Sequence, residues 1–155
     1  MRSAMWSGVL VTVVVGVAGC ATGGSRMSTP DAIAARQKLM KEQSAAGRAI
    51  QEKLKAGQTQ AAAADAETLA RTSRQIPSLF PEGSLDPNTS RAKPEIWQKR
   101  SEFEGYAKAL ETKAMQLAAT ARSGNQQATS AAFADLGKTT CTACHNAFRG
   151  PEIKK

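Results

Sequence analysis

Aromatic side chains, histidine and long apolar runs are all scarce in this chain of 155 residues. Aromatic residues make up 5% of the chain, and His145 is its one histidine. General acid–base catalysis needs titratable groups positioned at an open site, and a zinc site needs about four ligands. Because a second histidine is lacking for either purpose, the sequence predicts a protein that is neither an enzyme nor a zinc protein.

The longest apolar run, residues 9–18, is too short to cross a bilayer, which takes about 20 residues. It follows Arg2 and ends in Val-Ala-Gly-Cys, which resembles a bacterial lipoprotein signal with lipid attached to Cys20 after cleavage. We therefore expect a signal at 1–20 and a flexible tether at 21–29, and a periplasmic protein held to a membrane through Cys20. The alternative is an ordinary cleaved signal with an incidental cysteine.

The chain has few clusters of charge, although its formal net charge is +8, from 21 basic and 13 acidic residues. Nucleic-acid binding needs basic residues gathered on one face, whereas here they are scattered singly along the chain. The charge therefore predicts no nucleic-acid partner. A basic surface that meets an acidic redox partner protein fits the composition better.

Alanine is abundant, with 29 residues, and favours helices while burying little area. Apolar residues recur with helical spacing, and proline and glycine interrupt the pattern in a long loop at 77–93. No segment reads as a strand. The predicted helices lie at 30–55, 58–76, 94–122 and 126–148. We therefore expect an all-α, antiparallel four-helix bundle whose core needs bulk from another source.

The sequence Cys141-Thr142-Ala143-Cys144-His145 has the C-x-x-C-H spacing at which haem c is attached. Thiols at positions i and i+3 share one helical face, so each can bond to one porphyrin vinyl group, and the adjacent imidazole can bind the iron. Three alternatives are a thioredoxin-like redox pair, a zinc site and a plain disulfide within a purely structural helical module. The first lacks a mixed α/β context, the second lacks ligands, and the third leaves His145 without a role.

The segment CTACHNAFR near the C-terminus, the helix opening KPEIW and the N-terminal ARQKLM together resemble the class II c-type cytochromes. These are cytochrome c′ and its methionine-ligated, low-spin relatives, and the resemblance covers residues 30–149. It implies a left-handed four-helix bundle with one covalent haem c inside one end, a periplasmic location and a homodimer. Residues 150–155 then form a basic tail.

Two residues of the first predicted helix, Arg36 and Met40, lie one turn apart on its inward face. An arginine on an apolar face needs an anionic partner, and a haem propionate fits the guanidinium. The resemblance implies the same contact. The alternative is a guanidinium that reaches out to solvent.

Met40 decides between two functions. If its sulfur binds the iron opposite His145, the haem is six-coordinate and suits an electron carrier that cycles between Fe(II) and Fe(III). If Met40 only packs, the iron is five-coordinate and binds gases such as nitric oxide or carbon monoxide. The electron carrier is the main interpretation and the gas-binding protein its alternative. Phe133 and Phe148 are expected to wall the haem, with Lys138 and Arg149 beside it.

Overall fold

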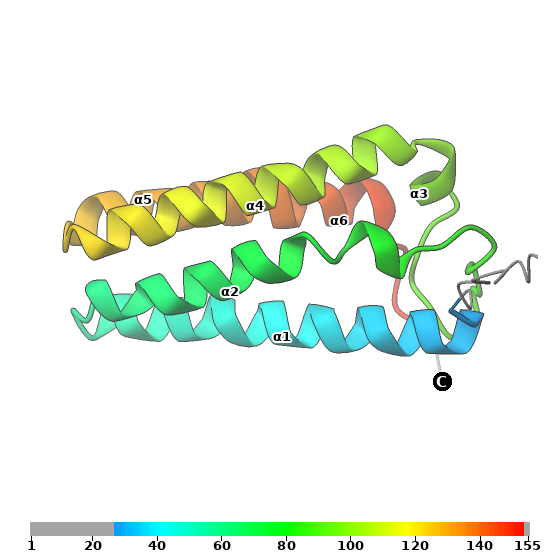
Figure 1. Cartoon of the computed structure of the whole chain (residues 1–155), viewed down its shortest axis with the longest axis horizontal. Coiled ribbons are helices and arrows are strands. Elements are labelled where there is room, and N and C mark those ends of the chain that lie inside the picture. Colours follow the sequence, from blue (N-terminus) through cyan, green and yellow to red (C-terminus); the bar gives the residue numbers. More distant parts are fainter. Residues whose placement is uncertain (1–26, 154–155) are drawn as a thin grey trace, which may run out of the picture.

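The computed structural model describes residues 27–153. The predicted signal, Cys20 and most of the predicted tether lie outside the described residues. Figure 1 shows four antiparallel helical arms in an elongated bundle, as predicted. The long loop and the C-terminal helix meet at one end of this bundle. Within 27–153, no helix is both long enough and apolar enough to span a bilayer.

The first arm is the single helix α1, Thr29–Lys55. Ser28 caps it, since the Ser28 side chain accepts a hydrogen bond from the Asp31 amide. Gly57 follows the helix in the left-handed region, at φ +71°, and turns the chain back.

The other three arms are interrupted where continuous helices were expected. The second consists of η1 (Gln60–Ala62), α2 (Ala63–Ser73) and η2 (Pro77–Leu79). The third consists of α3 (Glu95–Gln98) and α4 (Arg100–Arg122). The fourth consists of α5 (Gln126–Leu136), the π-helical η3 (Gly137–Thr142) and α6 (Ala143–Phe148).

The break between α3 and α4 has a tertiary cause. Lys99 leaves the helical region with φ −117° and ψ 47°. On either side of it, Trp97 donates its indole N–H to the Pro81 carbonyl at 2.9 Å, and Arg100 donates to the carbonyls of Pro77 and Phe80. The short helix α3 is thereby tied to the loop that precedes it, which a straight helix from 94 to 122 would not allow.

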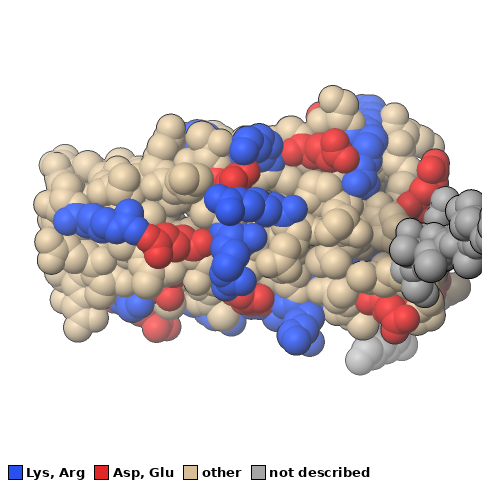
Figure 2. All heavy atoms as spheres, in the orientation of Figure 1, with Lys and Arg blue, Asp and Glu red and all other residues tan. Residues whose placement is uncertain are grey.

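One part of the core consists of small side chains. Buried alanines of η1 and α2 face buried alanines of α4, and we call this interface the alanine seam: Ala62, Ala63, Ala66, Ala70, Ala114, Ala118 and Ala121. Small side chains permit a close approach of the two helices. Around this seam, basic and acidic side chains alternate on the surface, as Figure 2 shows, and ion pairs such as Arg74–Glu111 (2.6 Å) join α2 to α4.

The other part of the core is aromatic. Phe103 of α4 packs edge to face on Phe80 and Phe148, with ring centroids 4.9 Å and 5.4 Å apart. Tyr106 lies 6.0 Å from Phe148. These rings gather the loop, α4 and α6 at the end of the bundle where the C-x-x-C-H segment lies.

Candidate functional site

A cavity of about 810 Å³ occupies this aromatic end of the bundle. Its walls come from all four arms and from the loop before α3. On the α1 side it is lined by Arg36, Met40, Gln43 and Gly47, and on the opposite side by the C-x-x-C-H segment. A cavity of this size, lined mostly by apolar groups with a few polar ones, is typical of a ligand or cofactor site.

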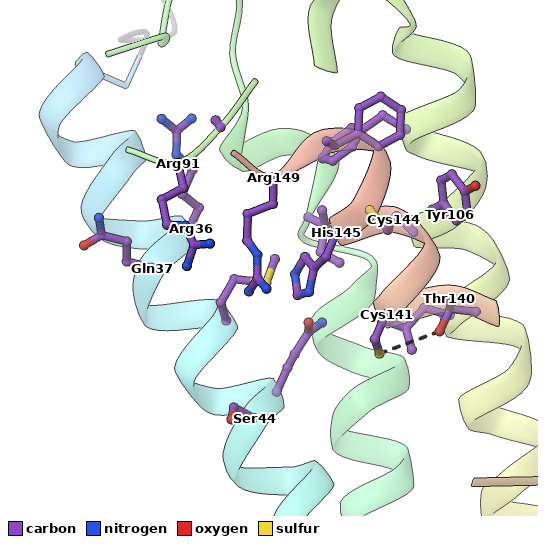
Figure 3. Close-up of a pocket in the computed structure, with 18 of the residues that line it drawn as sticks. Arg36, Gln37, Ser44, Arg91, Tyr106, Thr140, Cys141, Cys144, His145 and Arg149 are labelled. Atoms are coloured by element: carbon purple, nitrogen blue, oxygen red, sulfur yellow. Dashed lines mark hydrogen bonds between the residues drawn. The ribbon is translucent and has the colours of Figure 1, made fainter. Parts of the chain in front are cut away.

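Cys141, Cys144 and His145 all line this cavity, as Figure 3 shows. Both cysteines are half-buried free thiols, so the disulfide alternative is not realised in the structure. Cys141 lies in the π-helical segment and Cys144 in α6. The spacing therefore brings two thiols and one imidazole to a single wall, as the motif predicts.

The π-helical segment carries two threonines whose hydroxyls bond back to the helix. Thr139 donates to the Asp135 carbonyl at 2.8 Å and Thr140 to the Leu136 carbonyl at 2.6 Å. Such bonds compete with regular helical bonding, and π-helical turns are frequent at functional sites. The Thr140 hydroxyl also lies 3.7 Å from the Cys141 sulfur.

Burial sets the protonation of two of these groups. It raises the pKa of the Cys144 thiol to about 11, with a smaller contribution from Cys141, so Cys144 is a neutral thiol at neutral pH. Burial, followed by the charges of Arg149 and Arg91, lowers the pKa of His145. The neutral imidazole is therefore favoured, and its lone pair is free to bind a metal.

Arg36 is buried, with 3% of its surface exposed, so the solvent-facing alternative is wrong. It donates to the Ser84 carbonyl at 2.8 Å and to the Ser84 and Ser90 hydroxyls at 3.2 Å and 3.0 Å. The guanidinium also stacks on Phe80, 4.7 Å from the ring centroid. Among the described residues it has no carboxylate partner, and its buried Nε has no hydrogen bond. An anionic cofactor group would satisfy this charge.

Met40 is half-buried against the core and contributes to the α1 wall. The methionines Met27 and Met115 are 44% and 53% exposed and lie outside the cavity. Phe148 is 3% exposed and, with the half-buried Phe133, lines the cavity.

Two arginines stand at the rim. An isolated β-bridge between Ala92 and Arg149, with the Gly150 amide donating to the Arg91 carbonyl at 2.7 Å, fastens the end of α6 to the loop. Arg91 and Arg149 therefore line the cavity together, and Figure 3 shows Arg149 beside His145. Lys138, by contrast, is exposed on η3 and is not part of the cavity wall.

Sequence reasoning missed the residues that the loop supplies, namely Ser84, Ser90 and Arg91. They lie in a segment without periodicity, so no pattern assigns them to the site. The one available signal is the unusual length of the loop, which is typical of functional loops.

The residues around the cavity fit a covalent haem. Two thiols and a neutral imidazole share one wall, and a buried arginine with an orphaned N–H stands on another. Between them, apolar and aromatic side chains line a volume that the alanine-rich chain does not fill by itself.

Comparison with protein families gives a match to the family described as Cytochrome C′, over residues 31–149. Cytochrome c′ of Pararhodospirillum photometricum is 36% identical over 88 residues, which are 57% of this chain and 70% of that protein. Cytochrome c′ of Rhodospirillum rubrum is 33% identical over 84 residues, 54% of this chain. That alignment spans 56% of the relative's own length.

Solved structures match over a larger share. The crystal structure of cytochrome c′ from Thermochromatium tepidum has a TM-score of 0.70 at 29% identity, and the match covers 82% of this chain and all of that one. A nitric oxide complex and a carbon monoxide-bound form, both of variants of cytochrome c prime from Alcaligenes xylosoxidans, have TM-scores of 0.70 at 27% identity. The two matches cover 81% and 80% of this chain, respectively, and each covers 98% of the other chain. A cytochrome c′ with ligand-controlled dimer dissociation has a TM-score of 0.72 at 25% identity, with 80% and 98% covered.

Proposed function

The chain belongs to the cytochrome c′ family, and from this premise we propose that it binds small diatomic gases at a five-coordinate haem. Like the rest of its family, the chain carries one haem c, which is attached through Cys141 and Cys144. When bound, the haem would supply an iron that can take up nitric oxide or carbon monoxide. This function is the alternative of the sequence analysis rather than its main interpretation.

The observation that carries the proposal is the difference between the two facing walls of the cavity. The C-x-x-C-H wall offers an imidazole that burial keeps neutral, and so we assign His145 as the proximal ligand. The α1 wall contributes no histidine, cysteine or carboxylate, and its one sulfur is the thioether of Met40. A thioether on a helix stripe serves as packing more often than as a ligand.

The relatives support the same choice. Proteins with a similar backbone have been solved with nitric oxide and with carbon monoxide bound. Their match to this chain covers about as many residues as the structure describes. We infer that Met40 packs on the α1 wall and would leave room there for a small ligand.

Other residues of the cavity orient and enclose the haem. Arg36 is the residue that we expect to meet a propionate, since it is the buried cation without a carboxylate partner. Phe148, with Phe103 and Tyr106 packed against it, shields the site from water. These groups hold the cofactor in place and do not themselves bind the gas.

A titration of the ferrous protein with carbon monoxide tests the proposal. We expect uptake of one molecule per haem without displacement of a protein ligand, and the same uptake in Met40→Ala. Slow uptake in the native protein that becomes fast in Met40→Ala would show that the sulfur binds the iron, and would contradict the proposal.

Electron transfer is the second candidate, and the charge at the rim favours it. Besides the buried Arg36, three lysine or arginine residues line the cavity, namely Lys41, Arg91 and Arg149. The acidic residue of the same lining is Glu152, whose side chain is 90% exposed. An acidic redox partner would be attracted to this rim. The rate of reduction by such a partner should fall as salt is raised, whereas a rate independent of salt would remove this support.

We also propose the remaining organisation from the sequence: a signal at 1–20, a tether at 21–29, the cytochrome domain at 30–149 and a basic tail at 150–155. Cytochromes c′ are periplasmic proteins. For this chain we add a lipid anchor at Cys20, which predicts that Cys20→Ala moves the exported protein from the membrane fraction to the soluble fraction.

A homodimer is the further expectation, because a relative of the same fold forms a dimer whose dissociation is controlled by ligand. Sedimentation of the ferrous protein with and without carbon monoxide measures both the dimer and its dependence on ligand.

A further inference from the structure

The cavity has one neutral amide side chain that the proposed function does not use. Gln43 lies on α1 one turn after Met40, so the two side chains share the wall that faces the C-x-x-C-H segment. Its side chain is half-buried, and it stands among apolar lining groups such as Leu69 and Ile76 of the second arm. A polar group in such surroundings needs a hydrogen-bonding partner.

The orientation of the Gln43 amide follows from its neighbour Thr72. Thr72 is fully buried in α2, and its hydroxyl donates to the Thr68 carbonyl at 2.7 Å. A hydroxyl has one proton, so toward Gln43 the Thr72 oxygen can only accept. The atom 3.3 Å away from it must therefore be the nitrogen of the amide, as the structure has it.

This anchor uses one of the two N–H groups of Gln43. Among the described residues, the second N–H and the carbonyl oxygen make no hydrogen bond, and Gln43 is one of the residues that line the cavity. The α1 wall thus holds a donor at a fixed place beside Met40. The polarity of a haem pocket and its hydrogen-bond donors determine which small molecules are favoured there.

We propose that Gln43 donates a hydrogen bond to the small ligand in this cavity, so that ligands with negative charge on their outer atom, such as nitric oxide, are held in preference to carbon monoxide. The inference rests on the proposed function. Thr72 acts as a positioning residue, because it holds the Gln43 amide in one orientation and does not itself line the cavity.

The test is Gln43→Leu in the haem-loaded protein, which removes the donor and keeps much of the volume. In the ferrous carbon monoxide complex, the C–O stretching band should move to higher frequency, because a donor near the oxygen weakens that bond. A neutral hydrogen bond of ordinary strength predicts that nitric oxide dissociates about three- to tenfold faster. Carbon monoxide dissociation should change by less than about twofold. An unchanged band together with an unchanged nitric oxide rate would overturn the proposal.

A matched control lies on the same helix. Gln37 also contributes to the cavity lining, but its amide donates to the Thr89 carbonyl at 3.1 Å, and Figure 3 shows it on the side of α1 away from His145. Gln37→Leu should leave the C–O band in place. A shift equal to that of Gln43→Leu would mean that the band reports general disturbance of α1 and would also overturn the proposal.

Thr72 provides the test of positioning. Thr72→Val keeps the shape of the side chain and removes the acceptor, so the C–O band should broaden or move toward that of Gln43→Leu, while Thr72→Ser should restore it. A native band in Thr72→Val would contradict the anchoring role. If the native ferrous protein takes up no carbon monoxide at all, the proposed function fails with the inference. If carbon monoxide uptake is normal but the C–O band of Gln43→Leu is the same as in the native protein, the inference fails and the proposed function stands.

Discussion

The alanine seam and the cavity differ in how the space between the helices of the same bundle is filled. In the seam, the small side chains of alanine let α2 and α4 pack closely against each other. Around the cavity the helices stand apart, and aromatic rings, a buried arginine and about 810 Å³ of space lie between them. The chain fills the seam by itself, whereas at the other end it leaves the space in which we expect the haem to lie.

Removal of both attachment cysteines should give the largest difference in local stability between the cavity end and the seam. In Cys141→Ser with Cys144→Ser, purified without haem, amide hydrogens of α6 and of the first half of α1 should exchange at least about a hundredfold faster than in the native protein, since they border the unfilled space. Amides of α2 and α4 along the seam should change by less than about tenfold. Equal acceleration in both halves, measured by mass spectrometry, would mean that the core is not divided in this way.

Arg36→Met should lower the free energy of unfolding of the haem protein by about 2–4 kcal/mol, because Ser84 and Ser90 lose their partner and the cofactor loses a cation. In the haem-free protein the loss should be clearly smaller, since the variant also removes a buried charge without a carboxylate partner. Denaturant unfolding of both forms measures the difference. Arg48→Met, an exposed arginine on the same helix, serves as control and should stay within about 0.5 kcal/mol.

The seam should resist any added volume. Ala114 is fully buried, so Ala114→Leu should cost about 1–3 kcal/mol of stability by overpacking while the haem spectrum stays native. Ala64→Leu on the exposed side of α2 is the control, with an expected change within about 0.5 kcal/mol. A seam that accepts Leu at 114 without loss would show that close packing is not what holds α2 to α4.

The cavity wall should accept volume where the seam does not. Gly47 lies within α1, and a Cβ added there meets no atom within 4 Å. Gly47→Ala should therefore stabilise the haem-free protein by about 0.5–1 kcal/mol through helix propensity. Gly83→Ala is the opposite control, because the backbone there has φ +78° and Ala should destabilise it. A lower melting temperature of Gly47→Ala in thermal unfolding would contradict the conclusion that the cavity wall has room for a side chain at this position.

Local patterns in the sequence were enough to predict the four arms and the thiol and imidazole wall. Helical periodicity depends on neighbours three and four residues apart, and the attachment motif lies within five residues. Arg36 and Met40 were found for the same reason, since both belong to one stripe of α1. The need for added bulk in the core followed from the abundance of alanine.

Features that depend on distant contacts were not predicted. The break at Lys99 follows from Trp97 and Arg100 bonding to the loop. The π-helical segment, which includes Cys141, has no signal that periodicity could detect. Gln43 lies on α1, whereas its anchor Thr72 is on another helix. Residues that are far apart in the sequence and meet only in the folded protein produce no periodicity or motif from which their contact could be predicted.

The optical spectrum of the reduced protein, recorded before any gas is added, tests the central claim most directly. The account predicts a high-spin, five-coordinate ferrous haem that converts to a single carbon monoxide complex when the gas is admitted. A low-spin, six-coordinate spectrum in the native protein, lost in Met40→Ala, would contradict it and make this chain an electron carrier with sulfur on its iron.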